Sequence, residues 1–458
     1  MRMSVSAPRG CLALALAVSS LIPAAAFAGA PSVTPTFSKD VAPILQAKCQ
    51  QCHQPNSIAP MSLRTFQEAR PWAKAIRERV IARQMPPWHI DPSVGVQHFK
   101  NDMSLSQAQI DTIVRWVDAG APEGDPKDMP PPIPLATNDW QAVRDGFGPP
   151  DLVIRSDDYT MPARHQDVWW RPMSDIPITE PRWVKMVEIR PSSLKARRIV
   201  HHSIAYLVLN NDPDAVNRGT SSGAARQDDA VDVLVERRPQ LMEWAIGKGY
   251  DLYRPDTGKL ILPGEKIAWD QHIHADEKED ITGGSEIGLW FYPKGQEPKH
   301  RSYLVAFTGI DRSKMLDIPP NSMAQTEGFT VLKENAVLEN FQPHFHLRGK
   351  AMKVEAILPD GSRQVISYVS NFNFNWMTNY IYSDDAAPVL PKGTVIHVSA
   401  WYDNTRANRS NPDPDQWVGY GERTVDEMAH AWINVVYLSD AEYNALVQSR
   451  KTTNNTTQ

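Results

Sequence analysis

Short runs of β-branched and aromatic residues recur from Asp151 onward, and they limit the fold more than any other feature of the chain. Gly, Pro, Asn and Asp separate the runs, and helical periodicity is scarce in this part of the sequence. Such a pattern is typical of antiparallel sandwiches. The runs are DLVIRS, RWVKMVEIRP, HHSIAYLVLN, EIGLWFYP, AVLENFQPHFHLRG, TVIHVSAWYDN and AWINVVYLS. We therefore expect the large C-terminal part of the chain to be all β.

The first residues have the features of an export signal. Arg2 and Arg9 give a positive start, residues 11–22 form an apolar core, and Ala26 and Ala28 form a small-x-small cleavage site. The apolar core is too short to span a bilayer comfortably, and no later run is long enough to do so. We expect cleavage near Ala28, a periplasmic mature protein and no stable membrane insertion.

The charge balance and the cysteine count bear on the expected partners and on the use of the thiols. The chain of 458 residues has a formal net charge of −5 and no basic run, so we do not expect nucleic acid as a partner. Of its three cysteines, Cys11 lies in the export signal. The remaining pair, Cys49 and Cys52, is therefore expected to serve something other than a structural disulfide.

Cys49 and Cys52 belong to the motif Cys-Gln-Gln-Cys-His, which ends at His53. In a C-x-x-C-H motif the two cysteines form thioether bonds to the haem vinyl groups, and the adjacent histidine ligates the iron. The alternative is a disulfide-exchange motif, but no βαβ pattern of the thioredoxin kind surrounds these residues. The motif predicts one covalent haem c.

Met85, in the sequence RQMPPWH, is the expected second axial ligand of this haem. The two prolines that follow hold the backbone extended, so that the thioether can fold back over the haem and raise its reduction potential. The Met-Pro-Pro-Trp context resembles small bacterial cytochrome c domains. Three other side chains remain alternatives: Met61, His89 and His98.

Two helical patterns bracket the haem motif between about residues 37 and 120. The first runs through residues 41–48 into the cysteines, and the second is an apolar stripe over residues 110–117. Ser106 and Gln109 predict a capping box before the second helix, and Gly120 can end it. Two helices around an irregular middle are typical, in outline, of a small c-type cytochrome.

Six of the 13 histidines occur in tight groups on strand-like runs. The groups are His201 with His202, His272 with His274, and His344 with His346. Because residues i and i+2 of a strand share a face, His344 and His346 can bind one metal together. His201 and His202 would face opposite ways in a regular strand, so joint binding requires a bulge or a strand end. Imidazole suits copper, zinc, iron and nickel, whereas thioether sulfur favours copper(I). Met428, as a candidate thioether ligand, therefore points to copper among these metals.

The chain from about residue 149 to residue 438 resembles the copper type II, ascorbate-dependent monooxygenases, the family of peptidylglycine and dopamine hydroxylating enzymes. It looks most similar to bacterial members of that family. The resemblance lies in an ordered set of segments at comparable spacings: RRIVHHSIAYLV, GKLILPGEKIAWDQHIH, EIGLWF, PHFHLRGKAM and GERTVDEM. It implies two jelly-roll-like domains that each hold a copper and face each other across an open cleft.

The same resemblance implies the metal ligands. The ligands implied for the electron-transfer copper are His201, His202 and His272, with His274 as the alternative third ligand. The ligands implied for the oxygen-activating copper, and so the expected catalytic residues, are His344, His346 and Met428. A weak bond from a methionine to copper favours the cuprous state that meets dioxygen.

The expected fold class is multidomain, with a small all-α cytochrome c-like domain followed by two all-β jelly-roll or sandwich copper domains. Within the first copper domain, a polar stretch from about residue 211 to residue 258 is expected to be an insertion or a long loop. The expected parts are a signal peptide at 1–28, the cytochrome c-like domain at 31–120, a proline-rich linker at 121–150, the copper domains at 151–312 and 313–448, and a disordered tail at 449–458.

The expected function is a copper-dependent monooxygenase that hydroxylates a C–H bond of a small organic substrate with O₂. The reaction, RH + O₂ + 2e⁻ + 2H⁺ → ROH + H₂O, needs two electrons from outside. The resemblance implies ascorbate as the family's reductant, and here the fused haem gives an entry point for a periplasmic electron donor or an ascorbate-like reductant.

Two alternatives to this function are kept. One is a non-catalytic electron-transfer or copper-binding cytochrome fusion protein. The other is an enzyme that uses iron at the two-histidine sites, for which the sequence offers no obvious facial carboxylate.

Overall fold

The computed structural model describes residues 34–55, 59, 61–134, 140–208, 240–311 and 316–456. The expected signal peptide at 1–28 lies outside these residues. Within the described ranges, no helix combines the length and the apolar character that crossing a membrane requires.

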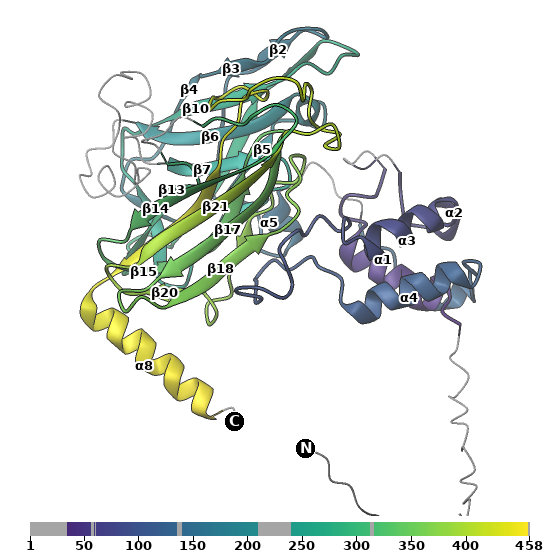
Figure 1. Ribbon diagram of the computed structural model, residues 1–458, viewed down its shortest axis with the longest axis horizontal. Helices are drawn as coiled ribbons and strands as arrows, with labels where there is room; N and C mark the ends of the chain where they lie inside the picture. Colours follow the sequence, from purple (N-terminus) through teal and green to yellow (C-terminus); the bar gives the residue numbers. More distant parts are fainter. Residues whose placement is uncertain are drawn as a thin grey trace, which may run out of the picture. The chain divides into compact units, whose positions relative to one another are not determined.

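Apart from α8, the helices are short, and most of them lie before residue 145. Helices α1 to α4 gather beside the sheets (Figure 1). They pack around a small apolar cluster that includes Phe37, Leu45, Ile113 and Trp116. The helical elements are η1 (Phe37–Val41), α1 (Ala42–Lys48), α2 (Phe66–Ala69), η2 (Arg70–Trp72), α3 (Ala73–Ile81), α4 (Gln107–Asp118), η3 (Pro126–Asp128), α5 (Gln141–Arg144), η4 (Ala196–Arg198) and α8 (Asp440–Thr456).

Helix α4 has the ends that the sequence predicts. The hydroxyl of Ser106 accepts a hydrogen bond from the backbone N–H of Gln109, and the side chain of Gln109 accepts one from the backbone N–H of Ser106. Two residues after the helix, Gly120 has a φ of +89°, a conformation that favours glycine. The expected capping box and helix end are confirmed.

The largest sheet has 11 strands and contains segments from both ends of the β-rich part of the chain. Its central pairings join β9 to β13 in parallel and β13 to β22 in antiparallel orientation. The strands are β1 (Leu152–Arg155), β5 (Arg182–Pro191), β8 (Tyr250–Leu252), β9 (Thr257–Ile261), β12 (Ser285–Phe291), β13 (His300–Thr308), β15 (Asn335–Leu338), β16 (Asn340–His344), β19 (Tyr380–Ile381), β20 (Val389–Leu390) and β22 (His430–Leu438).

Three smaller sheets complete the β structure. The five-stranded sheet contains β3 (Val168–Trp170), β4 (Met173–Asp175), β6 (Val200–Val208), β7 (Gln240–Ala245) and β10 (Lys266–Ile273). The four-stranded sheet contains β14 (Met323–Val331), β17 (Gly349–Ile357), β18 (Arg363–Val369) and β21 (Val395–Asp403). The two-stranded sheet pairs β2 (Tyr159–Met161) with β11 (Ile281–Gly283).

The expected fold class, a separate small all-α domain followed by two sandwich domains, is wrong. Contacts divide the chain into Met1–Thr34 and a single compact unit, Pro35–Gln458. The 11-stranded sheet joins strands from both halves of the expected β part, because β13 pairs with β22 along seven residue pairs from Ser302↔Val436 to Thr308↔His430. Sheets that share a continuous hydrogen-bond ladder are not two independent sandwiches. The expected boundaries inside this unit stay predictions.

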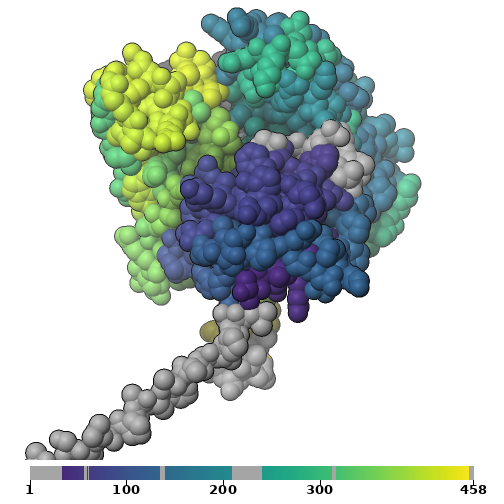
Figure 2. Space-filling view, turned by 90° about the vertical axis from the view of Figure 1, so that its right-hand side faces the viewer, coloured from purple at the N-terminus to yellow at the C-terminus, as the bar shows by residue number. Residues whose placement is uncertain are grey.

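The residues after α3 explain why the helical segment is not a separate domain. Trp88 and Ile90 are buried in the same apolar cluster as the strands around them, not in the helical cluster. The Trp88 ring packs edge-on against Tyr380, with the ring centroids 4.7 Å apart. Backbone hydrogen bonds extend this contact; for example, the N–H of Val96 donates to the carbonyl of Ile366. Figure 2 shows the purple and blue N-terminal segment on the face turned toward the viewer.

Two local expectations differ from the structure over the residues that it describes. The polar stretch from 211 to 258 contains β7 and β8 and the start of β9, although its residues 211–239 lie outside the described part. Residues 449–456 of the expected disordered tail lie in α8, which continues to Thr456.

We expect Trp88→Ala to destabilise the whole unit. Trp88 is 8 % exposed and packs on the sheets, so its removal should lower the free energy of unfolding by about 3–5 kcal/mol. Trp72→Ala is the matched control, because Trp72 is 43 % exposed and should cost less than about 0.5 kcal/mol. Denaturant unfolding followed by circular dichroism of the β structure measures both. If the unfolding transition of the β structure were the same in Trp88→Ala as in the wild type, the N-terminal segment and the sheets would not form a single cooperative unit.

Candidate metal centre

Strands β6 and β10 bring three histidines together. The ladder between them pairs His202 with His272 and then skips one residue, so that the next pair is Val200 with Ile273. His201 is the skipped residue, and a bulge of this kind lets adjacent side chains turn toward one volume. The candidate ligand atoms of His201, His202 and His272 all lie within 4.8 Å of one another.

The geometry of this first cluster suits one metal ion. The Nδ1 atoms of His201 and His202 are 3.5 Å apart. Two nitrogens bonded to one metal at about 2.0 Å are separated by roughly 3 Å, so a small ring movement completes the arrangement. The Nε2 atom of His201 is buried and has no hydrogen-bond partner among the described residues. These two observations concern different nitrogens of His201: a metal bound at Nδ1 uses the close pair, whereas a metal bound at Nε2 satisfies the costly unpartnered atom.

A carboxylate orients His272. Its Nε2 donates a hydrogen bond to Oδ2 of Asp167 at 2.9 Å, and the hydroxyl of Thr424 donates to the same oxygen at 3.0 Å. The ring of Trp169 stacks on the imidazole, with the centroids 4.7 Å apart and the planes 4° from parallel. The bond from His272 lowers the pKa of Asp167, which favours its charged form. With Nε2 engaged, Nδ1 of His272 is the nitrogen left for a metal.

His274, the alternative third ligand, lies farther out. Its ring centroid is 6.2 Å from that of His201, whereas the His272 centroid is 5.3 Å from it. His274 does not belong to the group of three with close ligand atoms. The geometry therefore favours His272.

A second cluster forms where β16 ends. His344 is the last residue of β16, and its ring centroid lies 5.5 Å from that of His346. The Nδ1 of His346 donates to the backbone carbonyl of Asp426 at 3.0 Å, which leaves Nε2 for a metal. The Nδ1 of His344 is buried without a partner among the described residues. Both imidazoles thus offer a nitrogen for coordination.

The buried carboxylate of Glu427 holds the segment of Met428 against this second cluster. It accepts hydrogen bonds from the backbone N–H groups of His346 at 3.0 Å and Met428 at 3.3 Å, and also from that of Arg348. Burial raises the pKa of Glu427 to about 7. Met428 is half-buried, and its backbone N–H shares Oε2 of Glu427 with the backbone N–H of His346, so the two residues are close along their backbones.

Sequence reasoning missed two residues at these clusters. His430 pairs with His344 across the β16–β22 ladder, and the two rings are nearly parallel with centroids 6.2 Å apart. Its position two residues after Met428, at the start of a strand-like run, was a usable signal. Asp167 lies 105 residues before His272, and no spacing rule connects them.

The two clusters are in contact. The ring centroids of His202 and His344 lie 6.2 Å apart. The open cleft that the family resemblance implies between two copper sites is therefore not present between these two side chains. One reason is that β7 and β16 are joined through a buried hydrogen bond from Gln342 to Glu243 at 2.7 Å.

Four histidines of the two clusters have lowered pKa values, which favours their neutral form near pH 7. Burial, and secondly the neighbouring imidazoles, hold the pKa values of His201, His202 and His344 well below the usual range. Burial lowers the pKa of His346 to about 4. Metals bind the neutral imidazole, so these side chains need not lose protons to become ligands near neutral pH.

A cavity of ≈ 690 Å³ opens beside the first cluster. His201 and His272 form part of its wall, together with Phe374, which stacks on His201 with the centroids 4.4 Å apart. Arg164 and Glu277 add charged groups to the wall. The cavity gives a small molecule access to the cluster.

The residues of the haem motif lie at the end of α1. Cys49 and Cys52 are half-buried free thiols, and burial raises the pKa of Cys49 to about 12 and also raises that of Cys52. The Nδ1 of His53 lies 3.3 Å from the backbone carbonyl of Met61, an arrangement that leaves Nε2 for iron. Within the described residues, these three side chains therefore fit covalent haem attachment.

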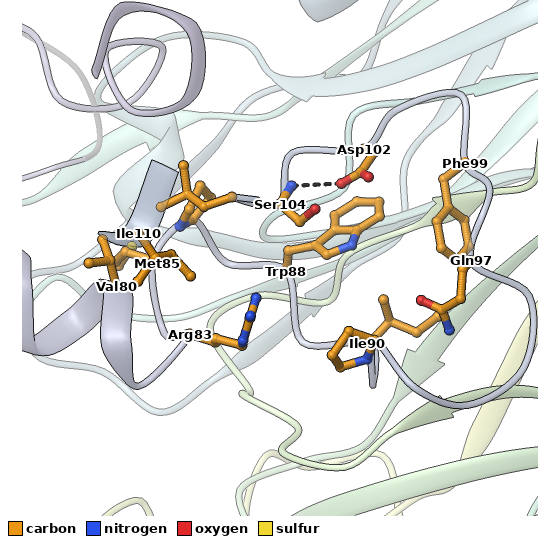
Figure 3. A pocket seen from close by; sticks show the side chains of 13 residues that line it. Val80, Arg83, Met85, Trp88, Ile90, Gln97, Phe99, Asp102, Ser104 and Ile110 are labelled. Atoms are coloured by element: carbon orange, nitrogen blue, oxygen red, sulfur yellow. Dashed lines mark hydrogen bonds between the residues drawn. The ribbon is translucent and has the colours of Figure 1, made fainter. Parts of the chain in front are cut away.

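Met85 lies at the end of the segment that follows α3. It lines a cavity of ≈ 230 Å³ in which it lies near Val80 and Ile110, with Trp88 and Phe99 farther along (Figure 3). Neither cysteine of the motif lines this cavity. Val80 and Ile110 of this lining also belong to the helical apolar cluster against which Cys49 and Met61 pack, and Met85 as the second axial ligand stays a prediction.

The three alternative ligands differ in position. Met61 is held at His53 through its backbone carbonyl. His89 is buried, and its backbone N–H donates to the hydroxyl of Tyr380. The backbone carbonyl of His98 accepts a bond from Ser383.

Comparisons with known proteins identify no family. No family model matches the chain. No curated protein sequence matches it.

Some solved structures show a distant likeness. The major capsid protein P2 of bacteriophage PM2 has 10 % identity and a TM-score of 0.23, over 63 % of this chain and 97 % of that one. The cowpea mosaic virus top component has 6 % identity and a TM-score of 0.29, over 64 % and 92 %. A putative alpha-L-fucosidase from Bacteroides ovatus has 6 % identity and a TM-score of 0.18, over 67 % and 41 %. TM-scores this low carry no argument about fold or function.

We expect Asp167→Ala to weaken metal binding at the first cluster. Loss of a carboxylate that orients a ligating histidine typically lowers metal affinity about 10–100-fold. Asp175→Ala is the control, because Asp175 is an exposed aspartate that pairs with Lys266 away from the cluster. Competition with a copper chelator measures both affinities. Equal copper affinity in the two variants would contradict the role of Asp167.

Proposed function

We propose that the protein is a periplasmic copper-dependent monooxygenase that hydroxylates a C–H bond of a small organic substrate with O₂. Its electrons enter through a c-type haem attached at Cys49 and Cys52, from a periplasmic donor or an ascorbate-like reductant. The observation that carries this proposal is the pair of adjoining clusters of mostly buried imidazoles. Buried imidazoles without partners are costly unless they serve a ligand.

Each of the two clusters would hold one copper. His201, His202 and His272 hold one copper, with Asp167 fixing the orientation of His272. His344 and His346, with Met428 beside them, hold the second. Copper at these positions supplies one-electron transfer and the activation of dioxygen.

Three properties of the surroundings support this chemistry. The thioether of Met428 is a soft donor that favours copper(I), the state that dioxygen must meet. The cavity beside His201 and His272 admits a small organic molecule, and Phe374 gives it an apolar face. His344 and His346 are buried, which limits the contact of the second cluster with water.

The role of Met428 separates catalysis from copper storage. We expect Met428→Ile to retain the fold, because a shape-preserving swap of this kind usually costs less than about 1.5 kcal/mol. It should keep copper on the first cluster and some copper on His344 and His346, yet lose substrate-dependent oxygen consumption. An oxygen electrode and copper analysis of the same preparation measure both properties.

Met323→Ile is the matched control for this experiment. Met323 is 55 % exposed on β14, away from both clusters, so the variant should consume oxygen like the wild type. Wild-type oxygen consumption in Met428→Ile would show that Met428 is a core residue and not a functional copper ligand, and the monooxygenase proposal would lose its best support. Finding one zinc and no copper after anaerobic copper loading would reject the copper assignment itself.

Covalent haem attachment has a separate test. We expect the wild-type protein to retain its haem after denaturation and extraction with acidified organic solvent, because thioether bonds survive that treatment. The double variant Cys49→Ala/Cys52→Ala should release any haem that it binds. Met85→Ala is the control, since it keeps both thioethers and should keep the haem. Absorbance spectra of the extracted protein decide between retention and release, and release from the wild type would refute covalent attachment.

A further inference from the structure

We propose that Trp376 and Phe374 form a bridge between the haem and the first histidine cluster, and that electrons pass along it from the haem to the copper of that cluster. This inference rests on the proposed function and deepens it, because it assigns the route between the two cofactors to two side chains. In this step one electron leaves the ferrous haem, which becomes ferric, and copper(II) becomes copper(I). The step moves no proton and breaks no covalent bond.

One end of the bridge lies at the haem motif. A cavity of ≈ 130 Å³ has both Cys52 and Trp376 in its wall. In a covalent haem the cysteine sulfur is bonded to a former vinyl group, so the edge of the haem at this cavity is its vinyl edge. The former vinyl groups are attached directly to the conjugated ring. An electron on the haem therefore reaches this cavity, and the indole of Trp376, at the thioether edge.

The other end of the bridge lies on the metal centre. The ring of Phe374 stacks on the imidazole of His201, with the centroids 4.4 Å apart and the planes 18° from parallel. Phe374 also lines the cavity of ≈ 690 Å³ beside this cluster. Rings stacked at this distance are in van der Waals contact, so no empty space separates Phe374 from a proposed copper ligand.

The chain joins these two rings over a short distance. Phe374 and Trp376 are two residues apart, and the Cα atoms of such a pair lie at most about 7 Å from each other. The backbone N–H of Trp376 donates to the carbonyl of Asn373 at 2.9 Å, which fixes the turn that contains both rings. Electrons tunnel faster through bonded and closely packed atoms than through empty space. The segment therefore offers a packed route between the two cavities.

Neighbouring parts of the chain hold the bridge in place. Trp376 packs on Gly247, where a Cβ atom would lie only 3.1 Å from the Cα of Trp376. Gly247 has a φ of +95° and follows β7, the strand beside β6. On the side of the N-terminal segment, the hydroxyl of Thr378 donates to the carbonyl of Pro87 at 3.0 Å. The bridge is thus fixed both to the sheet of the first cluster and to the segment that carries the haem motif.

The test is the rate of electron transfer from haem to copper within the anaerobic, copper-loaded, full-length protein. Pulse radiolysis adds single electrons to the oxidised protein, and the absorbance of the ferrous haem then decays as copper(II) accepts the electron. We expect Trp376→Leu and Phe374→Leu each to slow this decay severalfold, and the double variant to slow it further. Trp376→Phe and Phe374→Tyr should restore most of the rate because they keep an aromatic ring.

Phe329→Leu is the matched control. Phe329 stacks on His397 with the centroids also 4.4 Å apart, but it is 59 % exposed on β14 and lines neither cavity. Its decay rate should equal the wild-type rate. The reduction potentials of haem and copper and the copper content of each variant should also equal the wild-type values, which separates a changed route from a changed driving force.

Equal decay rates in Trp376→Leu, Phe374→Leu and the wild type would overturn the proposal. Should Phe374→Leu lose copper, Trp376→Leu decides alone, because Trp376 lies at the haem end of the bridge. A decay that is slowed as much in Phe329→Leu as in these variants would overturn the proposal too.

The outcomes keep this inference distinct from the proposed function. Wild-type protein that transfers electrons from haem to copper but consumes no oxygen fails as a monooxygenase, and the effect of the two aromatic residues on the rate is still measured. Wild-type protein that holds both cofactors but shows no internal transfer overturns this inference. Wild-type protein without covalent haem fails the extraction test above and overturns this inference as well.

Discussion

The residue skipped in the β6–β10 ladder is the constraint on which the candidate metal centre depends. In a regular strand His201 and His202 would point to opposite faces, and only one of them would meet His272. The ladder is continuous from Lys266↔Val208 to His272↔His202, so the register is fixed before the irregularity begins. A slip of one residue would move His202 to the other face and separate the three imidazoles. The metal centre is therefore a property of strand register as much as of residue identity.

Burial makes this arrangement costly without a ligand. The His201 and His344 rings each leave one nitrogen buried without a hydrogen bond among the described residues. An unsatisfied buried polar group of this kind costs about 1–3 kcal/mol. Protonation does not relieve the cost, since burial holds the pKa values of both rings well below the usual range. Coordination satisfies the nitrogen without placing a proton on the ring, which is why burial and metal binding are compatible here.

The sequence predicted what depends on local spacing and missed what depends on distant pairing. The capping box at Ser106 and the strand-like run around His201 each lie within a few residues, and both appear in the structure. The single compact unit was missed because it arises from the β13–β22 ladder and from Trp88 packing on the sheets, and residue spacing does not specify such pairings. Asp167 was missed for the same reason, since its strand neighbour β3 meets β10 only in the folded chain.

A single loop connects the two histidine clusters. Thr424 donates to Asp167, which in turn fixes His272 in the first cluster. Two residues later, the carbonyl of Asp426 accepts the bond that orients His346 in the second cluster. Met428 follows after another two residues. The residues that contact the two clusters thus lie within the five-residue segment 424–428. A change that moves this segment at one cluster therefore changes the ligand geometry at the other. With the His202 and His344 rings in contact as well, the clusters are coupled mechanically as well as electrostatically. Under the proposed function, metal occupancy at one cluster therefore affects the affinity of the other, and the two metals are not expected to load independently.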